Sequence, residues 1–192
     1  MSLELLIGPM FAGKSSAIQS IVKRHKALGW PVFAITHTID TRYSDEPAIV
    51  NHDRHSLPAF SSEKLMPMLL LDDYKQSRLV IVEEAQFFPD LIPFIHTVVD
   101  IDRKYAVVVG LDGDAERRPF GKVLDLIPLC DRVTKLTAFC KECSDGTPAL
   151  FTYDNYVLNE ASVGEPQVGG VERYEALCRK HFLDKKCGLQ NI

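Results

Sequence analysis

The chain alternates between short, almost entirely apolar runs and longer segments in which apolar residues recur every three or four positions. Apolar runs rich in β-branched residues predict buried strands, and such runs stand at 3–7, 30–37, 79–82, 105–111 and 135–139. The three-to-four spacing predicts helices after residue 14 and at 62–71, 91–99 and 171–182. Because strands alternate with helices, the pattern predicts an α/β fold: a parallel sheet flanked by helices on both faces.

Two polar stretches interrupt this alternation. Residues 40–60 predict a loop with short extended pieces; its Arg42 and Arg54 either meet phosphate or belong to a solvated loop. Residues 144–170 are rich in Gly, Pro, Asn, Asp and Ser, and they predict a long loop with room for one hairpin around Ala149–Tyr156. We therefore expect an α/β domain at 1–138 and a second, smaller domain at 139–192.

The segment between the first strand and the first helix has the Gly-x4-Gly-Lys-Ser pattern of a phosphate-binding P-loop. It comprises Gly8, Pro9, Met10, Phe11, Ala12, Gly13, Lys14 and Ser15. Glycines let the main chain turn tightly, so that N–H groups surround an anion at the start of a helix. The lysine then reaches the β- and γ-phosphates, and the serine hydroxyl can bind Mg²⁺. The helix that this motif requires is indicated by the apolar face of Ala17, Ile18, Ile21, Val22 and Leu28. The alternative is a glycine-rich turn before an ordinary helix.

Two carboxylates, Glu83 and Glu84, directly follow the strand predicted at 79–82. P-loop proteins place a second metal-coordinating carboxylate at such a strand end. Neighbours on a regular strand point to opposite sides, so one carboxylate would face the metal and the other the substrate. The alternative is that the pair caps the helix predicted at 91–99. Residues 112–121 also follow a strand, and parallel sheets bind ligands at this edge.

Two spaced pairs near the end of the chain suggest a metal site. Cys140-x2-Cys143 and Cys178-x2-His181 have the spacing of a tetrahedral, structural zinc site that would clamp the long loop. The alternative is a group of buried thiols with one incidental histidine. Cys130 and Cys187 lie outside the scheme, as do the remaining histidines.

Composition restricts the class of protein. The 192 residues are 46% hydrophobic and carry a net charge of −4, which argues against a general nucleic-acid binder. No apolar run approaches the roughly 20 residues that cross a membrane. The first strand begins almost at once, so we expect no signal peptide and a cytoplasmic protein.

Taken in order, these motifs resemble the type II thymidine kinases, the cellular and poxviral type. The resemblance rests on segments 8–15, 40–43, 52–54, 83–88, 110–113, 118–121 and 136–138, with Cys140, Cys143, Gly169-Gly170, Tyr174 and Cys178. It implies a P-loop domain with a small C-terminal zinc-binding domain, whose lasso loop, about 144–170, closes over a nucleoside. The implied reaction moves the γ-phosphoryl group of ATP to the 5′-hydroxyl of thymidine or deoxyuridine, with Glu84 as the proton acceptor.

The resemblance also implies roles for individual residues. Besides the P-loop, it implies that Asp40, Thr41, Arg42, Glu83, Glu84, Ala85 and Gln86 line the phosphates, with Mg²⁺ at Ser15 and Glu83. It implies that the nucleoside is bound by Met10, Phe87, Ala115, Phe120, Thr152, Glu165, Pro166, Gln167, Val168, Gly169 and Tyr174. Structural Zn²⁺ would be held by Cys140, Cys143, Cys178 and His181. A homotetramer inhibited by thymidine triphosphate is implied as well, without nucleic-acid or membrane partners.

The chain departs from the family pattern at three positions. Glu83 stands where the family has Asp, Ala115 replaces a large aromatic residue near the base, and His181 replaces a cysteine. Losing the aromatic ring weakens base binding or opens the pocket to larger nucleosides. Two alternatives stay open: a deoxynucleoside kinase of broader specificity, and a P-loop ATPase with a zinc-ribbon module. Intact Lys14, Ser15 and Glu84 argue against a catalytically inactive binding protein.

Overall fold

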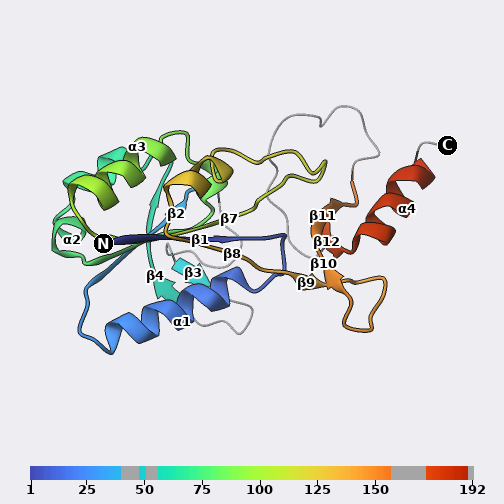
Figure 1. Ribbon diagram of the computed structural model, residues 1–192, viewed down its shortest axis with the longest axis horizontal. Coiled ribbons are helices and arrows are strands. Elements are labelled where there is room, and N and C mark those ends of the chain that lie inside the picture. The colour runs from blue at the N-terminus through green and yellow to red at the C-terminus, as the bar shows by residue number, and fades with distance from the viewer. Residues whose placement is uncertain (40–47, 51–55, 157–171, 190–192) are drawn as a thin grey trace.

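The structure is a computed structural model of residues 1–192, and it describes all of them except 40–47, 51–55, 157–171 and 190–192 (Figure 1). The described strands build a six-stranded sheet in the order β5-β2-β6-β7-β1-β8. Its strands are β1 (Ser2–Ile7), β2 (Val32–His37), β5 (Phe60–Ser62), β6 (Leu79–Val82), β7 (Tyr105–Gly110) and β8 (Arg132–Lys135). Each pairing between them is parallel, which confirms the predicted sheet.

Helices cover both faces of the sheet, as the sequence predicted (Figure 1). On one face, α1 (Lys14–Lys26) packs its buried Ile18, Ile21 and Val22 against the strands. On the other face lie α2 (Asp72–Gln76) and α3 (Leu91–His96), which continues as the π-helical turn η3 (Thr97–Ile101). Strand residues alternate between the two cores because successive side chains point to opposite faces. Burial on both faces explains why the strands read as continuous apolar runs.

The remaining elements of the first part of the chain are short. They are the antiparallel pair β3 (Ala48–Val50) and β4 (Ser56–Pro58), and the 3₁₀ turns η1 (Met66–Leu70), η2 (Ala85–Phe87) and η4 (Leu124–Leu129). The two short strands and β5 are the extended pieces expected within 40–60, or directly after it. Within the described segments, no helix combines the length and the apolar character needed to cross a membrane.

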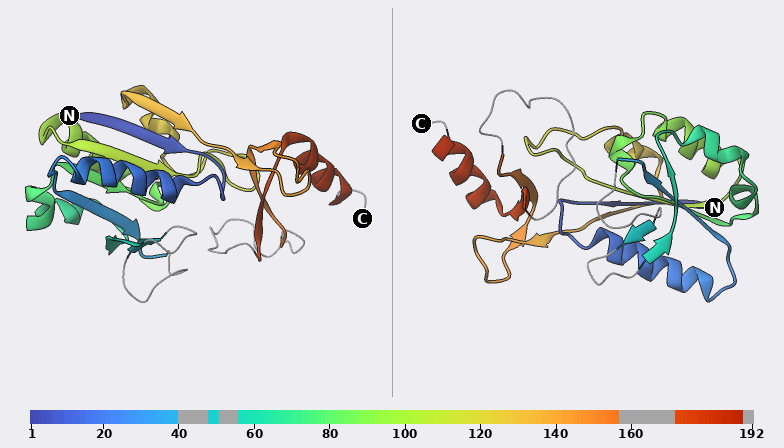
Figure 2. Two further views of the ribbon diagram at one scale, coloured as in Figure 1. Left: turned by 90° about the horizontal axis from the view of Figure 1, so that it is seen from below. Right: turned by 180° about the vertical axis from the view of Figure 1, so that it is seen from behind.

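We call residues 138–189, as far as they are described, the zinc-binding region, after the four zinc ligands predicted in it. This region lies beyond the carboxyl ends of the sheet strands (Figure 2). It contains β9 (Ala138–Phe139), β10 (Pro148–Ala149), β11 (Phe151–Asp154), β12 (Tyr174–Leu177) and α4 (Arg179–Leu189). Two antiparallel pairs, β9 with β10 and β11 with β12, surround a small core of their own. The domain boundary at 138/139 stays a prediction.

Four secondary-structure predictions were wrong. The strand at 135–139 is instead the end of β8 at Lys135 and the separate strand β9. The helix at 62–71 is instead the end of β5 followed by the short 3₁₀ turn η1, in which Pro67 provides no N–H. The hairpin at 149–156 does not form, because β11 pairs with β12, which follows it across the loop. The helix at 171–182 begins only at Arg179, since 174–177 is that partner strand. Leu28, assigned to the apolar face of α1, is 68% exposed beyond the end of the helix.

Candidate functional site

The P-loop turns sharply between β1 and α1. Gly8 and Gly13 have φ angles of 151° and 77°, and Phe11 also has a positive φ of 64°. A Cβ on Gly8 would lie 2.4 Å from the carbonyl oxygen of Leu136, so no side chain fits there. The Lys14 ammonium group donates hydrogen bonds to the carbonyl oxygens of Gly8 (3.2 Å) and Pro9 (2.7 Å). The lysine thus folds back over its own loop, towards the position that a phosphate group occupies in such loops.

Ser15 and Glu83 meet at the carboxyl edge of the sheet. The Ser15 hydroxyl donates a hydrogen bond of 2.9 Å to Oε1 of Glu83, which is only 7% exposed. The main chain of Glu83 is held by the carbonyl oxygen of Ile35 at the end of β2. A hydroxyl and a carboxylate oxygen are hard donors of the type that Mg²⁺ prefers, so the two side chains fit the ion.

Glu84 lies just past the end of β6 in a left-handed conformation with a φ of 51°. The strand has already ended, so the expected alternation of two carboxylates along a regular strand does not apply. The helix predicted at 91–99 begins at Leu91 and has Asp90, not Glu83 or Glu84, at its N-cap position, so the capping alternative is wrong. Oε2 of Glu84 instead accepts a hydrogen bond of 2.6 Å from Nε2 of Gln86.

Aromatic side chains gather beside Glu84. Phe87 and Phe120 meet edge to face with ring centroids 5.5 Å apart, so two predicted nucleoside-binding residues lie together. The ring of His37, at the end of β2, packs at a tilt against Phe87 and edge to face against Phe88, with centroids 5.5 and 4.9 Å away. Burial lowers the pKa of His37 from its ordinary value of 6.5, and the charges of Glu63 and Glu84 oppose that change. Our sequence analysis overlooked His37, although its position at a strand end on the ligand edge was a usable indication.

The acidic residues around Ala115 stabilise a small turn. Asp114 accepts hydrogen bonds from the main chain of Glu116 and Arg118, both 2.8 Å, and pairs with the Arg118 side chain. Glu116 forms an ion pair with Lys186 of α4, and the Arg117 guanidinium lies over two phenylalanine rings of the zinc-binding region. Glu116 thus joins this turn to α4. Ala115 itself is half-buried.

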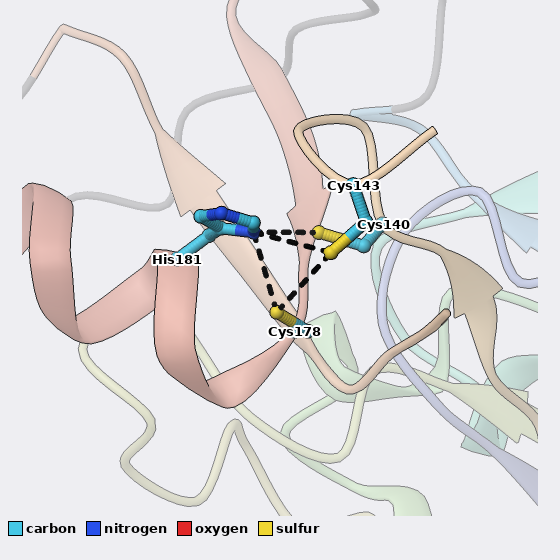
Figure 3. Close-up of side chains that lie close together, drawn as sticks. All are labelled: Cys140, Cys143, Cys178 and His181. Carbon is cyan, nitrogen blue, oxygen red and sulfur yellow. Dashed lines mark hydrogen bonds between the residues drawn. The ribbon is translucent and has the colours of Figure 1, made fainter. Parts of the chain in front are cut away.

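The predicted zinc ligands converge in space (Figure 3). Nδ1 of His181 lies 3.5, 3.3 and 3.4 Å from the sulfur atoms of Cys140, Cys143 and Cys178, and the last two sulfurs are 3.9 Å apart. A tetrahedral zinc site with ordinary bond lengths has ligand-to-ligand distances of about 3.5–3.8 Å. The cluster therefore has the donor types and the size to hold Zn²⁺.

The electrostatics of the cluster also favour a cation. Burial opposes ionisation of Cys140, but hydrogen bonds from Cys178, Cys143 and His181 lower its pKa to about 6. Burial and the hydrogen bond with Cys140 raise the pKa of Cys143 to about 11. Several thiolates in so small a space repel one another unless a metal ion neutralises them. Cys130 and Cys187 are outside this cluster, as predicted.

The P-loop and the zinc-binding region are in direct contact. The main-chain N–H of Met10 donates a hydrogen bond of 3.0 Å to the hydroxyl oxygen of Thr152 in β11. Thr152 is buried, and Phe11 and Ala12 pack against the core of the zinc-binding region. Two predicted nucleoside-binding residues, Met10 and Thr152, are thus brought together although 142 positions separate them.

Some predicted site residues have no described structure. Asp40, Thr41, Arg42 and Arg54 lie outside the described residues, as do Glu165, Pro166, Gln167, Val168 and Gly169. Tyr174 is described and half-buried at the start of β12, where the Arg173 guanidinium lies 5.2 Å from its ring centroid. The roles assigned to these residues stay predictions.

A P-loop at the edge of a parallel sheet, with a carboxylate hydrogen-bonded to its serine, defines a P-loop nucleotide-binding protein of the α/β class. A family model described as thymidine kinase matches residues 1–182, and the chain belongs to the thymidine kinase family. It is 38% identical over 185 residues to thymidine kinase a of Arabidopsis thaliana, covering 95% of this chain and 75% of that protein.

Two further relatives extend the comparison to animals and viruses. The human protein named thymidine kinase, cytosolic, is 34% identical over 190 residues, which are 97% of this chain and 75% of the relative. The variola virus thymidine kinase is 32% identical over 183 residues, which are 95% of this chain and 97% of the relative. The resemblance inferred from the motifs is thereby confirmed.

Proposed function

We propose that the protein transfers the γ-phosphoryl group of ATP to the 5′-hydroxyl of thymidine or deoxyuridine. The observation that carries the proposal is the contact between Ser15 and Glu83, with Glu84 as the next residue. It places a phosphate-binding loop and two carboxylates at one edge of the sheet. Family membership supplies the substrate class.

Phosphoryl transfer depends mainly on positioning and on neutralising phosphate charge. In the proposal, the main chain of residues 8–15 surrounds the phosphates and Lys14 reaches the β- and γ-groups. Asp40–Arg42 and residues 83–86 complete the wall of this site. Ser15 and Glu83 would hold Mg²⁺, which supplies positive charge to the phosphate oxygens when bound. Glu83 is one methylene longer than the family's Asp, and its carboxylate accepts the hydrogen bond from the Ser15 hydroxyl.

Glu84 is the proposed general base. A carboxylate accepts the proton of the attacking hydroxyl only within hydrogen-bond reach, so it must lie between the phosphate site and the nucleoside site. Two observations support this role: Glu84 directly follows Glu83, which contacts Ser15 of the P-loop, and its carboxylate is held by the Gln86 amide. Nothing in the described geometry requires a covalent intermediate on the protein.

For the nucleoside, we propose a site between Met10, Phe87, Phe120 and Thr152, closed by Tyr174 and by residues 165–169. The Phe87–Phe120 pair supports an aromatic wall for the base. Half-buried Ala115 supplies no ring there, so we expect weaker base binding or a pocket open to larger nucleosides. Main-chain groups of the lasso segment would discriminate bases, since a wrong base leaves buried polar groups unpaired.

Four further features belong to the same proposal. The cluster of Cys140, Cys143, Cys178 and His181 would hold structural Zn²⁺, which fits its four closed protein ligands. We also propose a homotetramer, inhibition by thymidine triphosphate and a cytoplasmic location, on the strength of the family resemblance.

The test is transfer of label from γ-labelled ATP to thymidine, deoxyuridine, deoxycytidine and deoxyguanosine, by the wild type and by Glu84→Gln. Labelled thymidine monophosphate from the wild type, with a loss of roughly 100-fold or more in the variant, is the expected result. Label in free phosphate alone, increased by added DNA or RNA, would favour the alternative of an ATPase with a zinc-ribbon module. Label in several nucleosides would instead indicate a broad-specificity kinase.

A further inference from the structure

The side chain of Gln86 is buried between two partners, one of which is the proposed base. Gln86 is 5% exposed. Its Nε2 donates a hydrogen bond of 2.6 Å to Oε2 of Glu84, and its Oε1 accepts one of 3.0 Å from the main-chain N–H of Leu111. The amide therefore links the carboxylate, which follows β6, to Leu111, which follows β7. These two strands are neighbours in the sheet.

The chemistry of these partners fixes which way the amide points. The N–H of Leu111 can only donate, so it must face the oxygen of the amide. The nitrogen then faces Glu84, whose carboxylate accepts. In the reverse orientation, the amide nitrogen would face the N–H of Leu111, and the amide oxygen would face the carboxylate of Glu84. Neither pair can form a hydrogen bond. Gln86 consequently offers Glu84 a donor and nothing else.

Two glycines leave room for Gln86 in this position. A Cβ on Gly110 would lie 2.7 Å from Oε1 of Gln86, and a Cβ on Gly121 would lie 2.1 Å from its carbonyl oxygen. A side chain at either position would clash with the glutamine. Glycine at 110 and 121 therefore leaves the space that Gln86 occupies.

We propose that Gln86 is a positioning residue that orients the Glu84 carboxylate for proton transfer, which rests on the proposed function of Glu84 as the base. Glu84 lies on a left-handed turn outside any regular strand or helix, so secondary structure alone does not fix its side chain. The Gln86 amide holds one carboxylate oxygen and so restricts the positions that the other oxygen can take. A base held in this way acts on the 5′-hydroxyl without first reorganising.

Two substitutions separate this role from a merely structural one. Gln86→Leu removes both hydrogen bonds with little change in volume. Gln86→Glu keeps an oxygen for the N–H of Leu111 but replaces the donor that faces Glu84. Gln76→Leu, at the exposed end of α2, is the matched control for the same chemical change.

For Gln86→Leu we expect kcat to fall roughly 10- to 100-fold while KM for both substrates changes less than about threefold. Gln86→Glu should lose activity at pH 8, where the introduced carboxylate repels Glu84. It should regain activity relative to wild type towards pH 6, where the two carboxyl groups share a proton that can bridge them. Gln76→Leu should resemble the wild type. If Gln86→Leu does not fold, the pH dependence of Gln86→Glu decides the question alone.

A double-mutant cycle completes the test. In the Glu84→Gln background, Gln86→Leu should have almost no further effect on kcat, because the two residues act as one unit. The inference is overturned if folded Gln86→Leu keeps the wild-type kcat, if Gln86→Glu matches the wild type at every pH, or if the two losses simply multiply. Full activity of Glu84→Gln would instead overturn the proposed base, and the inference with it.

Discussion

At the scale of single residues, backbone conformation explains why some positions admit only glycine. Gly121 has a φ of 59°, and a Cβ there would lie 2.1 Å from the carbonyl oxygen of Gln86. Gly29 has a similar φ of 71°, but no described atom lies within 4 Å of its Cβ position. We expect Gly121→Ala to lower the free energy of unfolding by about 3 kcal/mol or more, and Gly29→Ala by about 1 kcal/mol. Urea unfolding of both variants measures the difference, and equal losses would contradict this explanation.

His37 makes stability depend on pH. Burial lowers its pKa in the folded protein, and the charges of Glu63 and Glu84 only partly oppose this. The unfolded chain therefore binds the proton more readily, so the neutral ring stabilises the fold above pH 6.5. That contribution is lost as the pH falls below 6.5 through the lower folded-state pKa.

The matching variant is His37→Asn, whose amide oxygen can replace Nδ1 as the acceptor for the N–H of Ile39. We expect the wild type to lose more unfolding free energy than this variant between pH 7.5 and pH 5.5. Protonation of the zinc ligands affects both proteins alike, so urea unfolding at the two pH values isolates the histidine. Parallel losses in the two proteins would show that His37 is not responsible.

At the scale of elements, the turn η1 depends on a side chain far along the chain. Both carboxylate oxygens of Asp90 accept hydrogen bonds from the N–H of Leu65 (3.0 and 2.9 Å), and Oδ2 accepts another from Met66 (2.8 Å). These N–H groups start η1 and have no partner inside the turn. The apolar spacing within 62–71 predicted a helix. That local sequence does not include Asp90, the side chain that binds the first N–H groups of η1.

We expect Asp90→Ala to lower the free energy of unfolding by about 1–3 kcal/mol, because it leaves these N–H groups without an acceptor. Asp72→Ala is the matched control. The ion pair described for Asp72 is with Lys75, and both side chains are exposed. Exposed pairs contribute little, so the control should change stability by about 0.5 kcal/mol or less. Thermal and urea unfolding check both values, and similar losses would rule out the capping role of Asp90.

At the scale of the whole molecule, zinc and nucleotide binding should be coupled. The zinc-binding region contacts the P-loop through the hydrogen bond from Met10 to Thr152 and through packing of Phe11 and Ala12. Loss of the metal should loosen β11 and β12, because β12 leads directly into the ligands Cys178 and His181.

We expect a zinc-selective chelator to lower the Tm and to weaken ATP binding, measured by calorimetry without a nucleoside. Cys178→Ser should reproduce both effects without the chelator. Cys130→Ser, outside the cluster, should respond to chelation as the wild type does. Unchanged ATP affinity after zinc has left would show that the two regions act independently.

The sequence by itself determined the features whose cause is local. The P-loop pattern, the apolar strands and the spacing of the four zinc ligands were all readable, because tight turns, two-sided burial and metal coordination demand particular residue types at fixed intervals. The ordered set of short motifs along the chain, which includes the P-loop, sufficed to indicate the family. The apolar strands also placed Glu83 and Glu84 at the ligand edge, since parallel strands bring their ends together.

Only the tertiary structure decided which distant groups meet. Apolar spacing reports that a segment is buried but not against what, so β11 and β12 were assigned to a hairpin and a helix instead of to each other. Likewise, Asp90 stabilises η1 from 25 residues away. Gln86, which contacts Glu84, also bonds to Leu111, 25 residues further along the chain. Hydrogen bonds of this kind depend on geometry that no local pattern contains, and they fix how the site is held rather than which residues form it.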